Sequence, residues 1–250
     1  MGVPTHHARF LALPSDIRPD LSSMRLFTSG SAPLPARDHA AFRERFGHTI
    51  LERYGMTEVG IVLSNPIDGP RVPGTVGFPL RGVEVQVTDR ETLQPVPDGE
   101  IGELWIRGPG VISGYHDRPE ATSAALDGGW MRSGDLARRD PSDGRLSIVG
   151  RARDMIISGG LNVYPAEVEA VLREHPDVAE AAVFGLPDPD LGEQVVAAVV
   201  ARAPVTTTAL AAHCRKSLAG YKRPRKIRLT DRLPRNAMGK VQKHTLRAEG

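Results

Sequence analysis

The sequence lacks several features that would assign it to a particular environment. It has one cysteine, Cys214, so no disulfide can form within the chain, and a reducing compartment is expected. No apolar run approaches the roughly 20 residues of a membrane-spanning helix. Residues 1–14 lack the basic head and apolar stretch of a secretory signal. We therefore expect a cytoplasmic protein without a membrane span.

The chain also lacks a large excess of positive or negative charge. The chain has 32 Lys and Arg against 30 Asp and Glu, a net charge of +2, which gives no general reason to expect nucleic acid as a partner. The densest basic run, "YKRPRKIR" at 221–228, has no interleaved aromatic residues, and a solvated strand edge is its favoured interpretation. The eight histidines show no paired spacing typical of metal ligands.

What is present is typical of a folded globular chain. The 250 residues are 40% hydrophobic, enough for one large domain or two small ones. Glycine (26) and proline (21) are frequent, which favours many turns and short strands. There are no internal repeats and no low-complexity tracts.

Local patterns divide the chain at about residue 150. Residues 1–90 mix helix and strand, with a buried strand over 24–30, a helix over 36–47 and a strand over 48–60 that opens into a loop. From 74 to 150, short β-branched runs between Gly, Pro and Asp predict a small antiparallel β region. We expect one domain over 1–150 that contains this β-rich part.

Residues 151–250 predict a second, α+β domain. The segment 164–176 has proline at the first helical position, an acid in the first turn and apolar residues on one face, which indicates a helix. Strands are predicted over 178–187, 193–202 and 225–230, and a helix over 206–220 that glycine closes.

Five segments, in this order, resemble the adenylate-forming (AMP-binding) superfamily of acyl-CoA synthetases: "FTSGSAPLP", "ERYGMTEVG", "WMRSGDLARRD", "GRARDMIISGGLNVYPAEVE" and "PRNAMGKVQK". The stretches "GVPTHHARFLALP", "ERYGMTEVGIVLSNPIDGPRVPGTVG" and "PRNAMGKVQKHTLR" look most like malonyl-CoA synthetases. The resemblance implies the C-terminal half of such an enzyme. The expected fold is α/β plus α+β: part of the large domain, with an incomplete sheet and a small β-barrel region, then a small mobile domain.

One family feature is missing from the sequence. Family members carry a Ser/Thr/Gly-rich phosphate loop that ends in lysine, upstream of the segment that matches "SGSAP". "FTSGSAPLP" has no lysine and matches the later substrate-pocket segment. Without the phosphate loop, ATP would lose the cradle for its β- and γ-phosphates.

The family reaction joins a carboxylate to the α-phosphate of ATP and then transfers the acyl group to CoA. Negative charge builds up on phosphate in the first step, so a fixed cation is needed. A surface lysine is most often simply solvated, but the other motifs favour a catalytic role for Lys240, with Gly239 leaving space beside it. By resemblance, Thr57 contacts the α-phosphate and Glu58 ligates Mg²⁺.

Further nucleotide and acyl contacts follow from the resemblance. Asp135 suits the two vicinal ribose hydroxyls, although an aspartate after glycine is also common in turns. Tyr54 is expected against adenine or, equally well, in a core. The remaining expected nucleotide contacts are Gly55, Arg151, Ser31 and Ala32, the last two within the segment that also lines the acyl pocket. Gly30 and Met56 are expected to line that pocket.

The second step requires another face of the small domain. The resemblance places a hinge at Arg153, where relatives often have Asp or Lys, so that a domain rotation can exchange the two faces. Gly159 and Gly160 would leave room for the pantetheine arm of CoA, although a glycine pair is also simply a tight turn. The basic run at 221–228 is a weak candidate for the CoA phosphates.

Two classes of function therefore stay open. The first is an acid–CoA ligase that uses ATP, Mg²⁺ and CoA without a tightly bound cofactor, with malonate or a related small acid as substrate, or else an aryl or medium- to long-chain acid. A second carboxylate in the substrate should need a buried cation, which the sequence does not identify. The second class is an inactive truncated remnant or a fragment that only binds.

Overall fold

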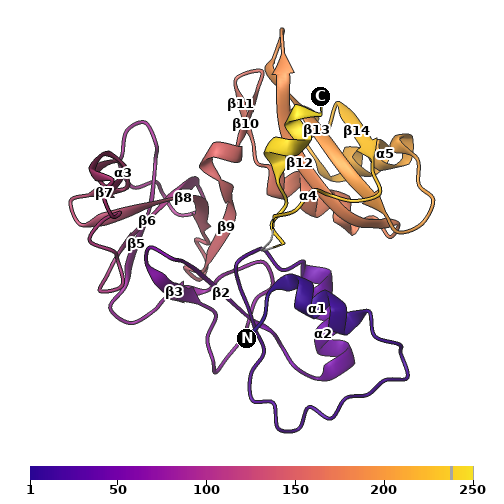
Figure 1. The fold of residues 1–250 in the computed structure, drawn as a ribbon, viewed down its shortest axis with the longest axis horizontal. Helices are drawn as coiled ribbons and strands as arrows, with labels where there is room; N and C mark the ends of the chain where they lie inside the picture. Colours follow the sequence, from indigo (N-terminus) through magenta and orange to yellow (C-terminus); the bar gives the residue numbers. More distant parts are fainter. Residues whose placement is uncertain (237–238, 250) are drawn as a thin grey trace. The chain divides into compact units, whose positions relative to one another are not determined.

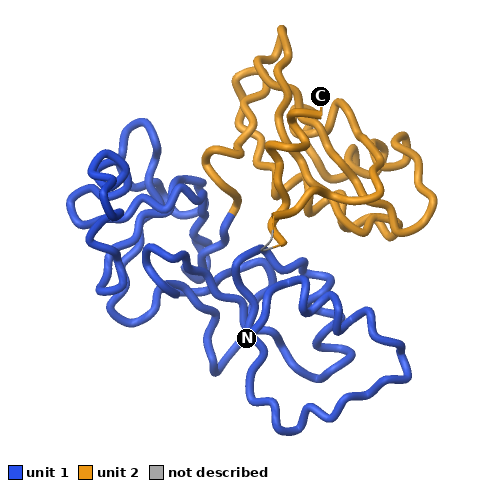
Figure 2. The backbone as a smooth tube through the Cα atoms, in the orientation of Figure 1, with its two compact units in different colours: residues 1–148 blue, residues 149–250 orange. Residues whose placement is uncertain are grey.

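The chain folds into two compact units, Met1–Ile148 and Val149–Gly250, which Figure 2 shows in blue and orange. The computed structural model describes residues 1–236 and 239–249. Ala237 and Met238, which belong to the "PRNAMGKVQK" motif, lie outside the described residues. No helix in the described ranges has the length and apolar character needed to cross a bilayer. The division falls close to residue 150, where the sequence pattern changes.

Unit 1 begins with two helices beside a four-stranded sheet (Figure 1). The elements are α1 (Pro4–Leu11), β1 (Thr28–Ser29), α2 (Ala36–Phe46), β2 (Leu51–Met56), β3 (Gly60–Ser64) and β4 (Phe78–Pro79). The order is β1-β2-β3-β4, with β1 and β2 parallel and the other pairs antiparallel. Gly47 ends α2 in the left-handed conformation, as a C-terminal glycine should.

The second sheet of unit 1 is the predicted β-rich region. Its elements are β5 (Glu84–Thr88), β6 (Ile101–Arg107), α3 (Pro119–Ala125), β7 (Leu126–Asp127), β8 (Trp130–Arg139) and β9 (Leu146–Arg151). The order is β5-β6-β8-β7, and β9 also pairs with β8. One apolar core joins this sheet to β3, because Val62 and Leu63 cluster with Val85, Leu104 and Ile106. The two sheets thus form one packed body.

Unit 2 is a five-stranded sheet with helices on both faces. Its elements are η1 (Ala152–Asp154), β10 (Ile156–Ser158), β11 (Leu161–Val163), α4 (Pro165–Glu174), β12 (Val178–Asp188), β13 (Gly192–Ala201), α5 (Thr207–Ser217), η2 (Gly220–Lys222), β14 (Lys226–Leu229) and α6 (Lys243–Ala248). The order is β11-β10-β13-β12, and β14 pairs with β13.

Alternate residues of β13 contribute to two apolar cores, one on each face of the unit 2 sheet. Val195, Ala197 and Val199 of β13 belong to a cluster that includes residues of α4 and α5. Val196 and Ala198 point to the other face and pack with Leu246 of α6. A strand that is apolar on both faces is buried on both, and β13 has this composition.

Three local predictions need correction. The strand expected over 24–30 forms only at Thr28–Ser29. The segment after β2 does not open into a loop: a short turn returns the chain into β3, so 51–64 is a hairpin. Glycine does not close the helix expected over 206–220, because α5 ends at Ser217 with Leu218 extended, and Gly220 begins η2. The helix α1, with proline in its first turn, was not predicted.

Candidate functional site

Two expected nucleotide contacts meet in unit 1. The Tyr54 hydroxyl on β2 donates a hydrogen bond of 2.6 Å to Asp135 Oδ2 on β8, 81 residues away in sequence. Both strands border the core shared by the two sheets, and Asp135 is 4% exposed. The "YGMTE" and "SGDL" motifs therefore occupy one place in the fold, with the phenol and the carboxylate facing each other.

A β-bulge beside Asp135 sets the direction of its side chain. The β6–β8 register shifts between Glu103 and Trp105. At this bulge Gly134 has φ of +69°, and its N–H donates to Glu103 Oε1 at 3.0 Å. The Asp135 N–H donates to Ser133 Oγ at 3.1 Å. A bulge re-aims a side chain relative to a regular strand, and here it turns the carboxylate toward Tyr54.

Thr57 and Glu58 occupy the turn between β2 and β3. Thr57 is exposed and Glu58 is half-buried. The Tyr115 hydroxyl donates to Glu58 Oε1 at 3.1 Å, and the Glu58 carbonyl accepts from Ile112 N–H at 2.9 Å. No local sequence pattern selects Tyr115, since it lies 57 residues from Glu58 along the chain. It holds the carboxylate expected to ligate Mg²⁺.

Glu58 does not belong to a protein-only metal site among the residues that the structure describes. No group of three or more metal-ligating side chains occurs within the described ranges. Mg²⁺ commonly binds through one or two carboxylates together with substrate phosphates and water. The residues present fit an ion that arrives with a phosphate ligand.

Gly55 is needed where β2 and β3 approach closely. A Cβ at this position would lie 2.1 Å from Gly60 O and 2.8 Å from Ile61 Cα. The register of the two strands shifts between Tyr54 and Gly55. Any larger residue would push the turn that carries Thr57 and Glu58 away from β3. The expected nucleotide contact of Gly55 stays a prediction, and its place in the fold has this packing reason.

The segment 30–32 follows β1 beside β2. Ser31 has φ of +69° and is exposed, as is Ala32. A Cβ on Gly30 would lie 2.9 Å from Arg53 Nη1 and 3.2 Å from Arg53 O. A guanidinium therefore lies against the expected acyl-pocket segment. Met56 is half-buried further along β2, with its Sδ 3.9 Å from the Tyr54 hydroxyl.

A buried carboxyl underlies this region. Glu52 is 6% exposed. Its side chain accepts hydrogen bonds from the N–H groups of Gly74, at 3.1 Å, and of Leu34, and so links β2 to two loops. Burial raises the pKa of Glu52 to about 7, and the two N–H donors oppose this shift only in part.

The raised pKa predicts a stability change with pH. Between about pH 4.5 and 7 the folded chain holds the Glu52 proton that the unfolded chain has lost, so the free energy of unfolding falls as pH rises. The gap corresponds to about 3 kcal/mol. We expect Glu52→Gln to remove this slope, so that by pH 8 the variant gains up to about 3 kcal/mol relative to the unchanged chain. Urea unfolding followed by tryptophan fluorescence measures it.

Two buried histidines also make the free energy of unfolding depend on pH. Burial lowers the pKa values of His7 and His39, so the stability they contribute is present above pH 6.5 and is lost as pH falls. Both chains carry these histidines, and the difference between the two stability curves isolates Glu52. Curves that stay parallel from pH 5 to 8 would contradict the prediction.

Lys240 lies on a tight loop in unit 2. Its side chain is exposed, and its N–H donates to Asn236 Oδ1 at 2.9 Å. The Asn236 N–H donates back to Lys240 O at 3.0 Å, and Gly239 has φ of +78°. Asn236 and Lys240 are therefore bonded to each other in both directions, while the lysine side chain is exposed.

The expected hinge and CoA residues lie at the start of unit 2. Arg151 ends β9, and Arg153 is exposed within η1. Gly159 and Gly160, with φ of +58° and +75°, form the two-residue turn between β10 and β11. Two positive φ values in a two-residue hairpin require glycine or a similar residue. The turn interpretation thus holds, and the CoA contact and the hinge stay predictions.

Several side chains of the basic run at 221–228 form contacts within unit 2. Lys222 forms an ion pair with Glu167 at 2.7 Å, and Arg223 Nε donates to Leu218 O at 2.9 Å. Arg228 lies over the Phe184 ring at 5.6 Å. Residues 226–229 form β14 at the end of the sheet next to β13, in agreement with the predicted strand.

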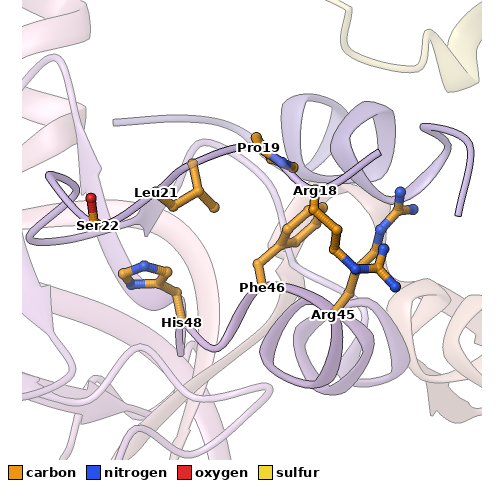
Figure 3. A pocket seen from close by; sticks show the side chains of 7 residues that line it. All are labelled: Arg18, Pro19, Leu21, Ser22, Arg45, Phe46 and His48. Carbon is orange, nitrogen blue, oxygen red and sulfur yellow. The ribbon is translucent and has the colours of Figure 1, made fainter. Parts of the chain in front are cut away.

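Two surface cavities are lined by none of the expected site residues. Figure 3 shows the first, of about 240 Å³, which Arg18, Pro19, Leu21, Ser22, Arg45, Phe46 and His48 line. The second, of about 470 Å³, includes His175, Asp177 and Thr206. In Figure 3, the Arg45 side chain rises from α2, and its guanidinium donates to the carbonyls of Leu11 and Pro14. That arginine ties a loop to a helix.

The sequence matches two protein-family profiles over most of its length. A profile of AMP-binding enzymes matches residues 1–116, and a profile of the AMP-binding enzyme C-terminal domain matches residues 167–240. Together they cover most of the chain, and they fall in unit 1 and unit 2 respectively. The chain belongs to the AMP-binding enzyme superfamily. The five motifs thus predicted the superfamily correctly.

Relatives within the AMP-binding superfamily include several CoA ligases. The sulfoacetate–CoA ligase of Cupriavidus necator is 43% identical over 246 residues, 96% of this chain and 47% of the relative. A feruloyl-CoA synthase of Amycolatopsis is 41% identical over 98% of this chain and 50% of the relative. The chain spans about half the length of the curated relatives it matches.

Solved structures of this superfamily show the same fold. ATP-bound MatB from Rhodopseudomonas palustris matches with a TM-score of 0.95 at 44% identity, over 100% of this chain and 50% of that one. The amide bond synthetase McbA from Marinactinospora thermotolerans matches with a TM-score of 0.92 at 38% identity. The predicted fold class, α/β followed by α+β, is confirmed.

Proposed function

We propose that this chain carries catalytic parts of an ATP-dependent acid–CoA ligase. The observation that carries the proposal is the hydrogen bond between Tyr54 and Asp135, which unites two nucleotide-binding motifs that are 81 residues apart. Curated relatives that are 38–43% identical to this chain are CoA ligases for sulfoacetate, ferulate, oxalate and long-chain fatty acids.

In the adenylation step, the acid attacks the α-phosphate of ATP and pyrophosphate leaves. Asp135 binds the ribose hydroxyls, Tyr54 lies against adenine, and Arg151, Gly55, Ser31 and Ala32 contact the nucleotide. Thr57 would donate a hydrogen bond from its hydroxyl to the α-phosphate, and Glu58, held by Tyr115, would ligate Mg²⁺, which would supply positive charge beside the phosphates. Lys240 supplies the cation that offsets charge on the carboxylate and the phosphate.

In the thioester step, the CoA thiol attacks the acyl carbon and AMP leaves. The Gly159–Gly160 turn has no side chains and leaves a Cβ-free path for the pantetheine arm. The basic run at 221–228 offers cations to the CoA phosphates. Arg153, just beyond the boundary between the units, is the hinge residue about which unit 2 exchanges its two faces.

The substrate proposed is malonate or a similar small acid with a second anionic group. The half-buried Arg53 supplies the cation that a second carboxylate requires, because its guanidinium lies against Gly30 in the acyl-pocket segment. Relatives that act on sulfoacetate and oxalate also take substrates with two anionic groups. Relatives that act on ferulate and long-chain fatty acids keep the alternative of an aryl or long-chain acid open.

The role of Arg53 can be measured by binding alone. We expect Arg53→Gln to weaken binding of a sulfamoyl analogue of malonyl adenylate about 10- to 100-fold, because a charge-assisted hydrogen bond is lost. The propionyl analogue, which has no second carboxylate, should bind both chains equally. Isothermal calorimetry measures both affinities.

An exposed arginine provides the control for Arg53. Arg81→Gln, in a turn before β5, should bind both analogues as the unchanged chain does. Equal weakening of the two analogues by Arg53→Gln would show that Arg53 supports the fold of the pocket without recognising the second carboxylate.

The proposed function is tested by mixing the chain with ATP, Mg²⁺, CoA and a panel of acids, and measuring AMP. Acid-dependent AMP formation that is fastest with malonate is the expected pattern. The rate is expected to be low, because the sequence has no phosphate loop for the β- and γ-phosphates. A preference for ferulate or a fatty acid would support the alternative substrates. Failure both to form AMP and to bind any adenylate analogue would contradict the ligase proposal.

A further inference from the structure

We propose that Arg235 and Glu180 are positioning residues that hold Lys240 as a fixed part of unit 2. The inference rests on the proposed function only for the role of the lysine. The geometry itself concerns the backbone on which Lys240 stands, and it can be tested without catalysis.

The segments on either side of Lys240 pair with each other. The Gln242 N–H donates to Pro234 O at 2.8 Å, and Arg235 and Val241 form a bridge. Asn236 and Lys240 close this small hairpin with bonds in both directions. Lys240 is therefore paired with Asn236 within this hairpin. A movement of the hairpin moves the Cα of Lys240 with it.

One guanidinium connects that hairpin to the sheet. Arg235 Nη1 donates to Gly239 O at 2.6 Å, directly before Lys240. Arg235 Nη2 donates to Glu180 Oε2 at 2.7 Å on β12. The same planar group thus bonds the turn on one side and a strand on the other, a geometry that the two ends of the guanidinium fork permit and a lysine cannot reproduce.

A second attachment lies on the other side of Lys240. Lys243, at the start of α6, forms an ion pair with Glu169 of α4 at 2.7 Å. Glu169 Oε1 also accepts from the Val183 N–H at 2.9 Å. Both side chains are less than one-fifth exposed, so water screens this pair weakly. Leu246 then packs α6 against the face of the sheet opposite to the one that α4 covers.

These attachments determine how Lys240 can move. The side chain of Arg235 bonds to β12 before the lysine and that of Lys243 bonds to α4 after it, so Lys240 is attached to unit 2 on both sides. The lysine leaves its place between the two reaction steps only if unit 2 moves as a body. Arg235 and Glu180 thus convert a motion of the unit into a motion of the ammonium group.

Amide hydrogen exchange of the whole chain, measured by NMR, tests this inference. In the unchanged chain, the N–H groups of Gly239 and Lys240 should be protected by their bonds to Asn236. We expect Arg235→Gln and Glu180→Gln each to speed exchange at these two amides about tenfold, because the loop opens locally. Amides of β12 and β13, such as Val183 and Val196, should keep their rates.

Two further variants make the result specific. Glu167→Gln removes an ion pair with Lys222 that is also in unit 2, and it should leave Gly239 and Lys240 unchanged. Arg235→Lys keeps the charge opposite Glu180 and should recover part of the protection. Unchanged loop exchange in Arg235→Gln, or equal acceleration throughout β12 and β13, would overturn the inference.

Catalysis provides a separate readout. Where the unchanged chain forms AMP, Arg235→Gln should lower kcat with little change in the KM for ATP. Absence of AMP from every chain would count against the proposed function, and the exchange data would still decide whether Arg235 and Glu180 hold the loop.

Discussion

Replacement of Lys240 by alanine is expected to lower acid-dependent AMP formation by about 100- to 1,000-fold. Removal of one group that stabilises charge in a transition state has an effect of this size. Lys240 is exposed, and the loop bonds around it involve its backbone, so the substitution leaves those bonds in place. The measurement is AMP formation from ATP, Mg²⁺, CoA and malonate.

The same variant separates the two reaction steps. Lys240 is proposed to act while the phosphate carries developing charge, so CoA thioester formation from a supplied acyl adenylate should fall far less than AMP formation from ATP. Lys216→Ala, on the exposed surface of α5, is the matched control and should behave as the unchanged chain. An alanine variant that keeps its rate within about threefold would exclude a catalytic role for Lys240.

The largest expected effect on stability is that of Phe42→Ala, a loss of about 3–5 kcal/mol in the free energy of unfolding of unit 1. Phe42 on α2 is fully buried. Its ring lies 4.8–6.2 Å, between centroids, from those of His7, Phe10, Phe27 and Phe46. Alanine would leave a cavity at the centre of this cluster, which holds α1 and α2 against β1.

Tryptophan fluorescence reports this loss for unit 1 specifically. The two tryptophans, Trp105 and Trp130, both belong to that unit, so a urea titration follows its unfolding. Ile61→Ala, at a side chain that is 46% exposed, should change the midpoint little. A loss below about 1 kcal/mol for Phe42→Ala would show that the cluster closes around the smaller side chain.

Local patterns predicted most of unit 2. Short, nearly continuous apolar runs predicted β12 and β13, and a proline followed by an acid predicted the start of α4 at Pro165. These signals succeed because short apolar runs and the fixed φ of proline act over a few residues. The end of α5 was wrong, because glycine is a frequent but not a required terminator and Leu218 turns into the core instead.

Groups that act together across long separations were not predictable from those patterns. Tyr115 reaches Glu58 across 57 residues, and Arg235 reaches Glu180 across 55. Each pair depends on which strands become neighbours and in what register. Arg53 is one of 32 basic residues, and only the parallel pairing of Ser29 with Glu52 places it beside Gly30.

The sequence by itself determined the superfamily, the order of the motifs and the type of α4, β12, β13, α5 and β14, because these depend on residues close together along the chain. Only the tertiary structure decided which side chains meet: Tyr54 with Asp135, Arg53 with Gly30, and Arg235 with Glu180. A shift of one residue in the register of β2 or β8 would turn Tyr54 or Asp135 to the opposite face of its sheet. The register is set by the burial of whole cores, and so no short motif can encode it.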